Sequence, residues 1–113
     1  EDAKDDFMPS PGGITAFALP GGNHVRTDTH CYEGYLVSPF YDSLLGKLIT
    51  TGDTREDALA NMQTALEDFE IEGIKTNIPF LRFLIEQPEF IAGDIHIKWI
   101  ENTALPKFIE SIQ

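Results

Sequence analysis

The sequence has one cysteine, few positive charges and no long apolar run. Its single cysteine, Cys31, excludes an internal disulfide framework and suits a reducing compartment. No apolar stretch approaches the roughly 20 residues that are needed to span a bilayer, and no signal-peptide pattern opens the chain. We therefore expect a protein that neither crosses a membrane nor depends on disulfides.

Cations are scarce. The 113 residues include 8 Lys and Arg against 19 Asp and Glu, which gives a net charge of −11. A surface of this sign repels phosphate backbones, so no nucleic-acid partner is expected. The same field repels small anions such as ATP and bicarbonate, unless a local group of cations overrides it.

What the sequence does contain is enough apolar material for one folded domain. Hydrophobic residues make up 42% of the chain and aromatic residues 11%, which favours a globular fold over disorder. Strand-like patterns occupy the first half and helix-like patterns the second, which predicts an α+β fold. We expect a small antiparallel sheet from the N-terminal half, packed with two to four helices from the C-terminal half.

The strand predictions depend on alternating residues and on turn signals. Residues 14–19 and 24–30 are expected to form a hairpin around the turn sequence at residues 20–23. Residues 32–37 and 43–51 are two further candidate strands. Proline at position 39 should end the first of these, because proline cannot donate a ladder hydrogen bond.

Thr54 begins the clearest helix. Its hydroxyl is placed to cap the chain, and Asp57 follows at the spacing of a capping box. An apolar stripe then recurs at helical spacing. Its members are Ala58, Leu59, Met62, Ala65, Leu66 and Phe69.

Four shorter elements are expected after residue 76. Asn77 can cap a second helix with Pro79 in its first turn, and Pro88 can start a short third helix or a turn that Gly93 ends. Residues 94–100 are predicted as a brief strand. The inward residues of the second helix and of a terminal helix are expected to be Ile78, Leu81, Leu84 and Ile85, and Leu105, Phe108, Ile109 and Ile112 respectively.

The histidines, the cysteine and the glycine pairs do not form a convincing chemical site. His24 and His30 would stand roughly 20 Å apart on one strand, too far to share a zinc ion. Cys31 and His30 are adjacent and would point to opposite faces, so Cys31 is predicted to be a small buried residue. The pairs Gly12-Gly13 and Gly21-Gly22 precede strands rather than helices and are predicted to be turns. We predict no metal site.

Arg26 is one of the few cations. Alternation along residues 24–30 puts it on the same strand face as Asp28, which predicts an exposed ion pair of little consequence for stability. Asp42 is predicted to be a turn residue and Lys47 an edge-strand cation. The residues by themselves therefore yield an acidic α+β domain without an assembled active site.

A family resemblance adds to this interpretation. Several sequence blocks, taken in order, resemble the C-terminal domain of biotin carboxylase, the ATP-dependent component of biotin-dependent carboxylases. The blocks are Met8-Pro9-Ser10-Pro11-Gly12, Pro20-Gly21-Gly22, Val25-Arg26, Tyr32-x-Gly34-Tyr35, Tyr41-Asp42-Ser43-x-x-Gly46-Lys47-Leu48, Ile71-x-Gly73-Ile74-Lys75-Thr76-Asn77 and Phe90-x-x-Gly93.

The resemblance implies a domain of an ATP-grasp ligase. In that family ATP activates bicarbonate, and the carboxyl group passes to N1 of biotin. ATP, Mg and bicarbonate would be bound mainly by a region upstream of Glu1. Residues 1–113 are thus expected to be a fragment, inactive alone, with a tail at 102–113 that matches no family block.

The resemblance assigns one site residue, Arg26, as both catalytic and biotin-binding. The family's arginine at this place contacts the biotin ureido oxygen and stabilises the enolate-like charge that forms when N1 loses its proton. A guanidinium suits this role, because it stays charged and donates several directed hydrogen bonds.

The implied partners are the upstream ATP-grasp domain, a biotin carboxyl carrier and a carboxyltransferase. A homodimer is also implied, with residues 44–69 near its surface, and the location would be cytoplasmic, or else the mitochondrial matrix or a plastid. The alternative function is a non-catalytic acidic module for dimerisation or interaction. The identity of the final carboxyl acceptor is not encoded in these residues.

Overall fold

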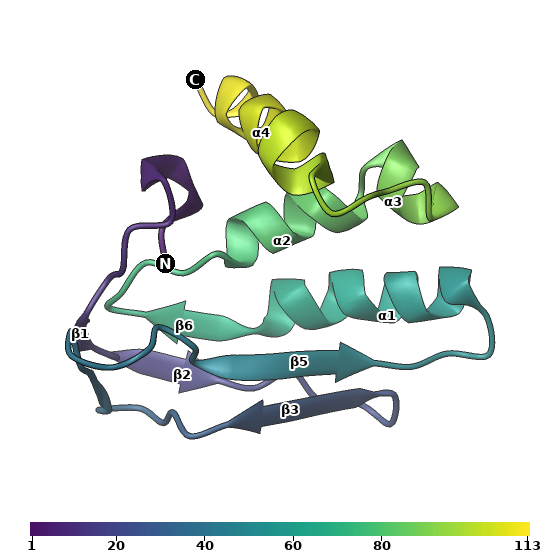
Figure 1. Cartoon of the computed structure of the whole chain (residues 1–113). Helices are drawn as coiled ribbons and strands as arrows, with labels where there is room; N and C mark the ends of the chain where they lie inside the picture. The colour runs from purple at the N-terminus through teal and green to yellow at the C-terminus, as the bar shows by residue number, and fades with distance from the viewer.

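The computed structural model describes residues 1–113 and confirms the α+β fold. Short strands form a layer beneath α1 and α2, and α3 and α4 lie above α2 (Figure 1). The elements in chain order are η1 (Ala3–Asp5), β1 (Gly12–Gly13), β2 (Ala16–Ala18), β3 (Val25–Thr29), β4 (Leu36–Val37), β5 (Gly46–Thr50), α1 (Arg55–Asp68), β6 (Glu70–Glu72), α2 (Ile78–Ile85), α3 (Pro88–Ala92), the π-helical η2 (Ile100–Ala104) and α4 (Leu105–Ser111). No helix has both the length and the apolar character needed to cross a bilayer.

The strands pair with distant partners. β2 pairs with β6, β3 with β5 and β1 with β4, all antiparallel. The predicted hairpin between residues 14–19 and 24–30 is therefore wrong. β2 instead places Phe17 opposite Ile71 and in edge contact with Phe69, at 5.9 Å between ring centroids. We attribute the non-local pairing to the contacts among these apolar side chains. A pairing of β2 with β3 would instead place Phe17 next to a strand that carries charged residues on one face.

Three smaller strand predictions also need correction. Gly12 and Gly13 form β1 rather than a turn, and the strand expected at residues 32–37 is limited to β4. Residues 94–100 contain no strand and lead into η2. In this segment the alternating residues Ile95 and Ile97 are exposed, and only Trp99 is buried. The alternation therefore does not mark a strand that packs one face against the core.

The helices follow the sequence signals closely. The Thr54 hydroxyl accepts a hydrogen bond from the Asp57 amide at 3.1 Å, and Gly93 ends α3 in the left-handed conformation. Asn77 occupies the N-cap of α2 without a side-chain hydrogen bond. The neighbouring Thr76 hydroxyl accepts from the Ile78 amide at 3.3 Å instead, so the predicted capping side chain is wrong by one residue.

The core is built mainly by the second half of the chain. Leu84 and Phe108 are buried as predicted, whereas Ile112 is exposed. The sequence stripe for α2 omitted Phe80, which is 2% exposed and packs against the tilted ring of Phe108 at 5.1 Å between centroids. The main buried cluster consists of Ala3, Phe80, Leu84, Trp99, Ala104 and Phe108.

Gly73 follows β6 directly and lies against the backbone of residues 13–15, which gives a first prediction. Its φ is +99°, and a Cβ there would collide with the Gly13 carbonyl oxygen and lie 2.9 Å from the Thr15 nitrogen. We expect Gly73→Ala to lower the free energy of unfolding by about 2–5 kcal/mol, from backbone strain and overpacking together. Urea denaturation measures this loss.

Gly13→Ala is the matched control, because a Cβ on Gly13 meets no atom within 4 Å. Its expected change in the free energy of unfolding is below about 1 kcal/mol. Equal losses in the two variants would contradict the assignment of Gly73 as a position that requires glycine.

Candidate functional site

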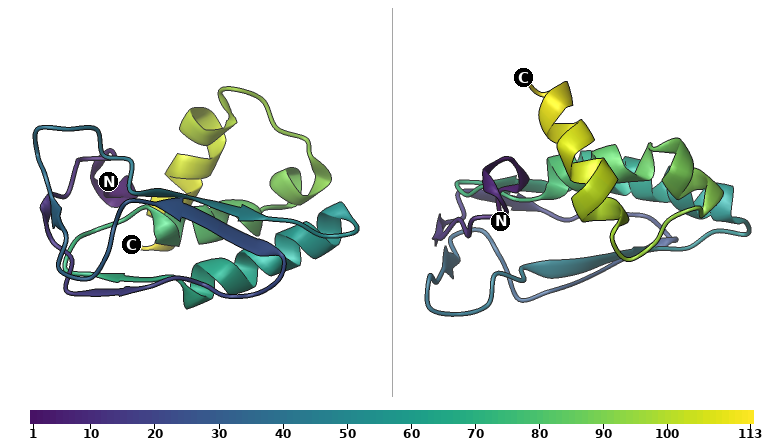
Figure 2. Two further views of the ribbon diagram at one scale, coloured as in Figure 1. Left: turned by 90° about the horizontal axis from the view of Figure 1, so that it is seen from below. Right: turned by 45° about the horizontal axis from the view of Figure 1, so that its top comes forward.

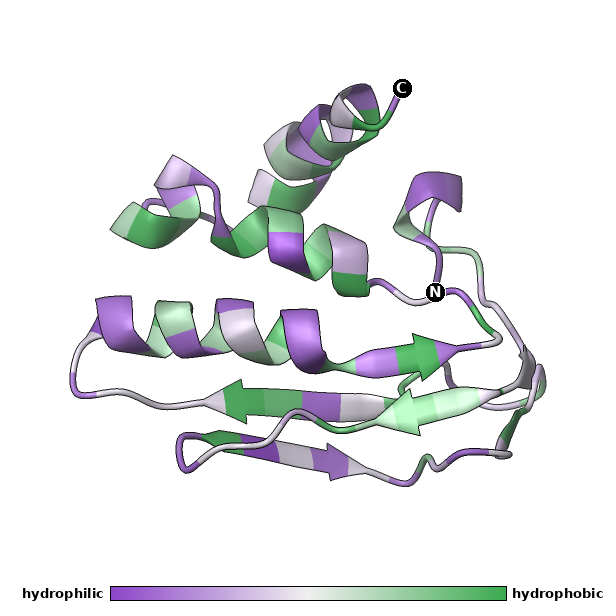
Figure 3. Ribbon diagram, turned by 180° about the vertical axis from the view of Figure 1, so that it is seen from behind, coloured by the Kyte–Doolittle hydropathy of each residue, from purple (hydrophilic) through white to green (hydrophobic).

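β3 presents an exposed polar face at the edge of the molecule. Arg26 and Asp28 are exposed, whereas Val25, Thr27 and Thr29 are half-buried, so the predicted alternation is confirmed. Seen from below, β3 faces the viewer and no helix lies over it (Figure 2). Its ribbon is mainly polar in colour, in contrast to the apolar stretches of the strand above it (Figure 3). The face is therefore open to a partner or ligand.

Arg26 and Asp28 form a two-pronged ion pair on this face. Nε of Arg26 donates to Oδ1 of Asp28 at 2.9 Å, and Nη2 donates to Oδ2 at 3.0 Å. The side chains are 72% and 45% exposed. The ion pair expected from the sequence is thus confirmed, with fork-to-carboxylate geometry.

The pair is ionised throughout the neutral pH range. The hydrogen bond and then the charge of Asp28 raise the pKa of Arg26. The hydrogen bond from Arg26, aided by the charges of Arg26 and Lys47, holds the pKa of Asp28 below its ordinary 3.8, against a smaller opposing effect of partial desolvation. Because a lowered carboxyl pKa favours the charged form, the pair persists at neutral pH and is lost only in acid, as the pH falls through the lowered pKa of Asp28.

The ion pair leaves part of the guanidinium free. Arginine carries five N–H donors in one plane, and Asp28 takes one from Nε and one from Nη2. Both hydrogens of Nη1 and one of Nη2 remain. These donors can bind a carbonyl-type oxygen, or stabilise negative charge that develops on it.

Lys47 adds a second cation nearby. It stands directly opposite Asp28 in the register of β3 and β5, and it is exposed. Arg26, Asp28 and Lys47 together carry a net charge of +1 on a chain whose total is −11. This is the kind of local cationic group that an anion would require on such a surface.

The cysteine and two of the histidines considered in the sequence make only local contacts. Cys31 is buried as predicted, with its thiol near the Leu45 carbonyl oxygen at 3.5 Å. Nδ1 of His24 lies 3.3 Å from the Thr51 hydroxyl, and the ring of His30 is in edge contact with Tyr35. No group of three or more His, Cys, Asp or Glu side chains is arranged to hold a metal ion.

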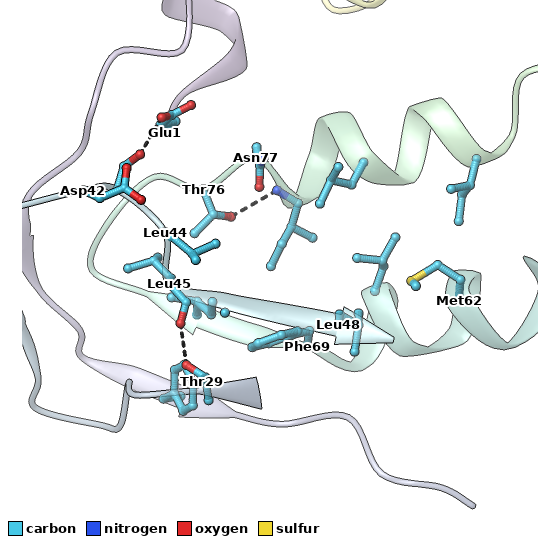
Figure 4. A pocket seen from close by; sticks show the side chains of 18 residues that line it. Glu1, Thr29, Asp42, Leu44, Leu45, Leu48, Met62, Phe69, Thr76 and Asn77 are labelled. Carbon is cyan, nitrogen blue, oxygen red and sulfur yellow. Dashed lines mark hydrogen bonds between the residues drawn. The ribbon is translucent and has the colours of Figure 1, made fainter. Parts of the chain in front are cut away.

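A cavity of about 550 Å³ lies between the sheet and the helices α1 and α2, and the sequence analysis did not anticipate it. Its apolar wall includes Leu48, Met62 and Phe69, and its polar end includes Glu1 and Asp42 (Figure 4). Met62 and Phe69 belong to the predicted inward stripe, but a stripe does not reveal how completely the opposing layers fill the space. Arg26 does not line this cavity, so the cavity and the exposed face of β3 are different sites.

Comparison with known proteins identifies the family. The profile of the family described as "Biotin carboxylase C-terminal domain" matches residues 1–102. The chain belongs to this family. The resemblance carried by the sequence blocks is therefore confirmed.

Relatives support the same assignment. The chain is 46% identical over 102 residues to biotin carboxylase 1 of Bacillus subtilis, covering 90% of this chain and 23% of the relative. It is 50% identical over 102 residues to biotin carboxylase of Haemophilus influenzae, covering 90% and 22%. This biotin carboxylase C-terminal domain thus spans less than a quarter of the length of the relatives it matches.

A solved structure shows the same fold. The biotin carboxylase domain dimer of 2-oxoglutarate carboxylase from Hydrogenobacter thermophilus, in complex with MgADP, ADP and bicarbonate, superimposes with a TM-score of 0.91 at 37% identity. The match covers 96% of this chain and 24% of that chain. Because the coverage exceeds residues 1–102, the structural likeness reaches into the tail beyond the family match.

Proposed function

We propose that this domain is the C-terminal part of a biotin carboxylase, within a longer polypeptide that carboxylates biotin at the expense of ATP. The observation that carries the proposal is an exposed, always-charged Arg26, with free N–H donors, in a chain of this family. The full-length relatives are named biotin carboxylases, and one related structure contains MgADP and bicarbonate.

Arg26 is the residue of this chain that would act on biotin. Its free donors would hold the ureido oxygen and stabilise the negative charge that develops there as N1 is deprotonated. A guanidinium donor that is already ordered stabilises such charge without reorganisation at the moment of reaction. When bound, biotin supplies the nitrogen that accepts the carboxyl group.

The other reactants would be held elsewhere. This chain offers no cluster of acidic or histidine ligands for a metal ion, and its net charge of −11 disfavours ATP and bicarbonate. We therefore place ATP, Mg and bicarbonate on an upstream ATP-grasp domain. A biotin carrier and a carboxyltransferase would be the further partners, with the cytoplasm as the proposed location.

A homodimer is part of the proposal. Leu44, which lies within residues 44–69 and outside β3 and β5, is 52% exposed and would be covered by a second subunit. The related 2-oxoglutarate carboxylase domain is itself described as a dimer. A full-length protein that stays monomeric in analytical ultracentrifugation would overturn this part of the proposal.

The second candidate function is a non-catalytic acidic module of the same fold. It is favoured by one observation, the ion pair of Arg26 with Asp28, because a surface arginine without a substrate would pair in the same way. Under this alternative, Arg26 has no role beyond its own strand.

Biotin-dependent ATP turnover separates the two functions. The full-length polypeptide should hydrolyse ATP faster when free biotin and bicarbonate are added, whereas residues 1–113 alone should show no turnover. A full-length polypeptide that fails to respond to biotin would support the non-catalytic module.

A further inference from the structure

We propose that Asp28 is a positioning residue for biotin carboxylation, which holds the Arg26 guanidinium in the orientation that receives the ureido oxygen. The inference rests on the proposed function of Arg26 and adds a second residue to it. It derives from the geometry of the exposed face of β3, where these two side chains form a bidentate contact.

The backbone beneath the pair is fixed. All five residues of β3 are in register with β5, from Val25 opposite Thr50 to Thr29 opposite Gly46. At the end of the strand, the Thr29 hydroxyl accepts a hydrogen bond from the Cys31 amide at 3.0 Å and donates to the Leu45 carbonyl. The Cα positions of Arg26 and Asp28 are therefore held by a paired strand rather than by a loop.

The side chain of Arg26 would otherwise be free. It is 72% exposed, and Asp28 is its only hydrogen-bond or ion-pair partner. An exposed arginine without such a partner samples many rotamers, so its side chain must lose conformational entropy each time a ligand binds. Two parallel N–H···O contacts fix the plane of the guanidinium, so its free edge points in one direction before the ligand arrives.

The division of donors suits this role. Asp28 occupies Nε and one hydrogen of Nη2, which is the side edge of the fork. The end edge, with Nη1 and the second hydrogen of Nη2, stays available for one oxygen. A carboxylate that occupied both terminal nitrogens would block this edge, whereas side-on pairing leaves it open.

Lys47 offsets the negative charge that Asp28 brings next to Arg26. A lone carboxylate beside Arg26 would weaken the attraction between the guanidinium and developing negative charge. Lys47 stands opposite Asp28 in the adjacent strand, so its charge offsets that of the carboxylate. The group remains net positive while Arg26 is held in place.

The test is a double-mutant cycle in the full-length polypeptide, with free biotin as the varied substrate. Wild type, Arg26→Ala, Asp28→Ala and the double variant are compared by kcat and KM for biotin and by KM for ATP. We expect Asp28→Ala to lower kcat/KM for biotin by about tenfold, because Arg26 must then be ordered at each turnover. The KM for ATP should be unchanged.

The cycle distinguishes an Asp28 that acts by positioning Arg26 from an Asp28 that acts independently of Arg26. If Asp28 acts through Arg26, Asp28→Ala should have no further effect in the Arg26→Ala background. Asp28→Glu, which keeps a carboxylate on the same face, should recover most of the lost kcat/KM. Asp28→Asn keeps the shape but only one acceptor oxygen, and should fall between wild type and Asp28→Ala.

Glu101→Ala is the matched control. Glu101 also forms an exposed ion pair, with Lys98 at 3.4 Å, and the substitution removes the same charge far along the chain from β3. Its kcat/KM for biotin should match wild type. An equal loss in this control would overturn the inference, because loss of any surface carboxylate would then suffice.

Three further outcomes would overturn the inference. Wild-type kcat/KM in Asp28→Ala, or a tenfold loss that persists in the Arg26→Ala background, would exclude positioning through Arg26 but leave the role of Arg26 intact. Full activity in Arg26→Ala would overturn the proposed function as well, so the two failures are distinguishable.

Discussion

Arg26→Ala in the full-length polypeptide is expected to lower biotin-dependent ATP turnover by about 100- to 1,000-fold, the typical cost of removing one preorganised donor to developing negative charge. Most of the loss should appear in kcat, because Arg26 is proposed to stabilise charge that forms only during deprotonation of biotin, and loss of its contact with the ureido oxygen should also raise the KM for biotin. Arg26→Lys should recover little activity, since an ammonium lacks the planar fork that the Asp28 contact orients. Steady-state assays with saturating ATP and bicarbonate provide the measurement.

Arg82→Ala controls for the loss of one surface cation. Arg82 lies on α2, is 48% exposed at its side chain and pairs with Glu67 at 3.8 Å. Its substitution should leave both turnover and thermal stability near wild type. Arg26→Ala should also keep the wild-type melting temperature, because the side chain is exposed and its ion pair contributes little to stability. Unchanged turnover in Arg26→Ala would favour the non-catalytic module.

Phe80→Ala is expected to lower the free energy of unfolding by about 3–5 kcal/mol, the usual loss for a large aromatic side chain in a core. Phe80 is 2% exposed and contacts the rings of Phe7 and Phe108 at 5.7 and 5.1 Å between centroids. A domain of this size is stabilised by only about 5–15 kcal/mol in total, so the variant should be close to unfolding at physiological temperature. Urea denaturation followed by circular dichroism measures the loss.

Phe40→Ala is the matched control for the same side chain. Phe40 is 89% exposed, so its removal opens no cavity, and the free energy of unfolding should change by less than about 0.5 kcal/mol. A loss of similar size in both variants would contradict the placement of the core around α2 and α4.

Local features were predictable because their causes are local. The capping hydroxyl of Thr54 acts on an amide three residues away, and the ion pair of Arg26 with Asp28 follows from the period of two in a strand. The end of α3 at Gly93 follows from a left-handed cap that glycine adopts readily. In each case the interacting groups are neighbours in the sequence.

Strand partners were not predictable, because their choice depends on distant residues. β2 pairs with β6 across more than 50 residues, where Phe17 meets Ile71 and Phe69. The turn at residues 20–23 gave a strong hairpin signal, and the burial of these side chains overrode it. The same limit hid Phe80, whose burial depends on packing against Phe108 from α4.

The functional site shows a similar division. The face of β3 and the pairing of its charges were predicted from the residues, whereas the chemical role of Arg26 came from a family resemblance. No spacing rule gives that role, because one exposed arginine beside an aspartate fits a surface ion pair equally well. The register that sets Lys47 opposite Asp28 became visible only in the structure.

The mass of the native polypeptide tests the central claim most directly. An antibody raised to residues 1–113 should detect a band of roughly four to five times the mass of this chain, since the chain's matched segment makes up about 20–23% of its relatives. Such a band would place the domain within a carboxylase-sized protein, as the proposed function requires. A sole band near 12.6 kDa would contradict the account, because the domain would then lack the region that is proposed to bind ATP.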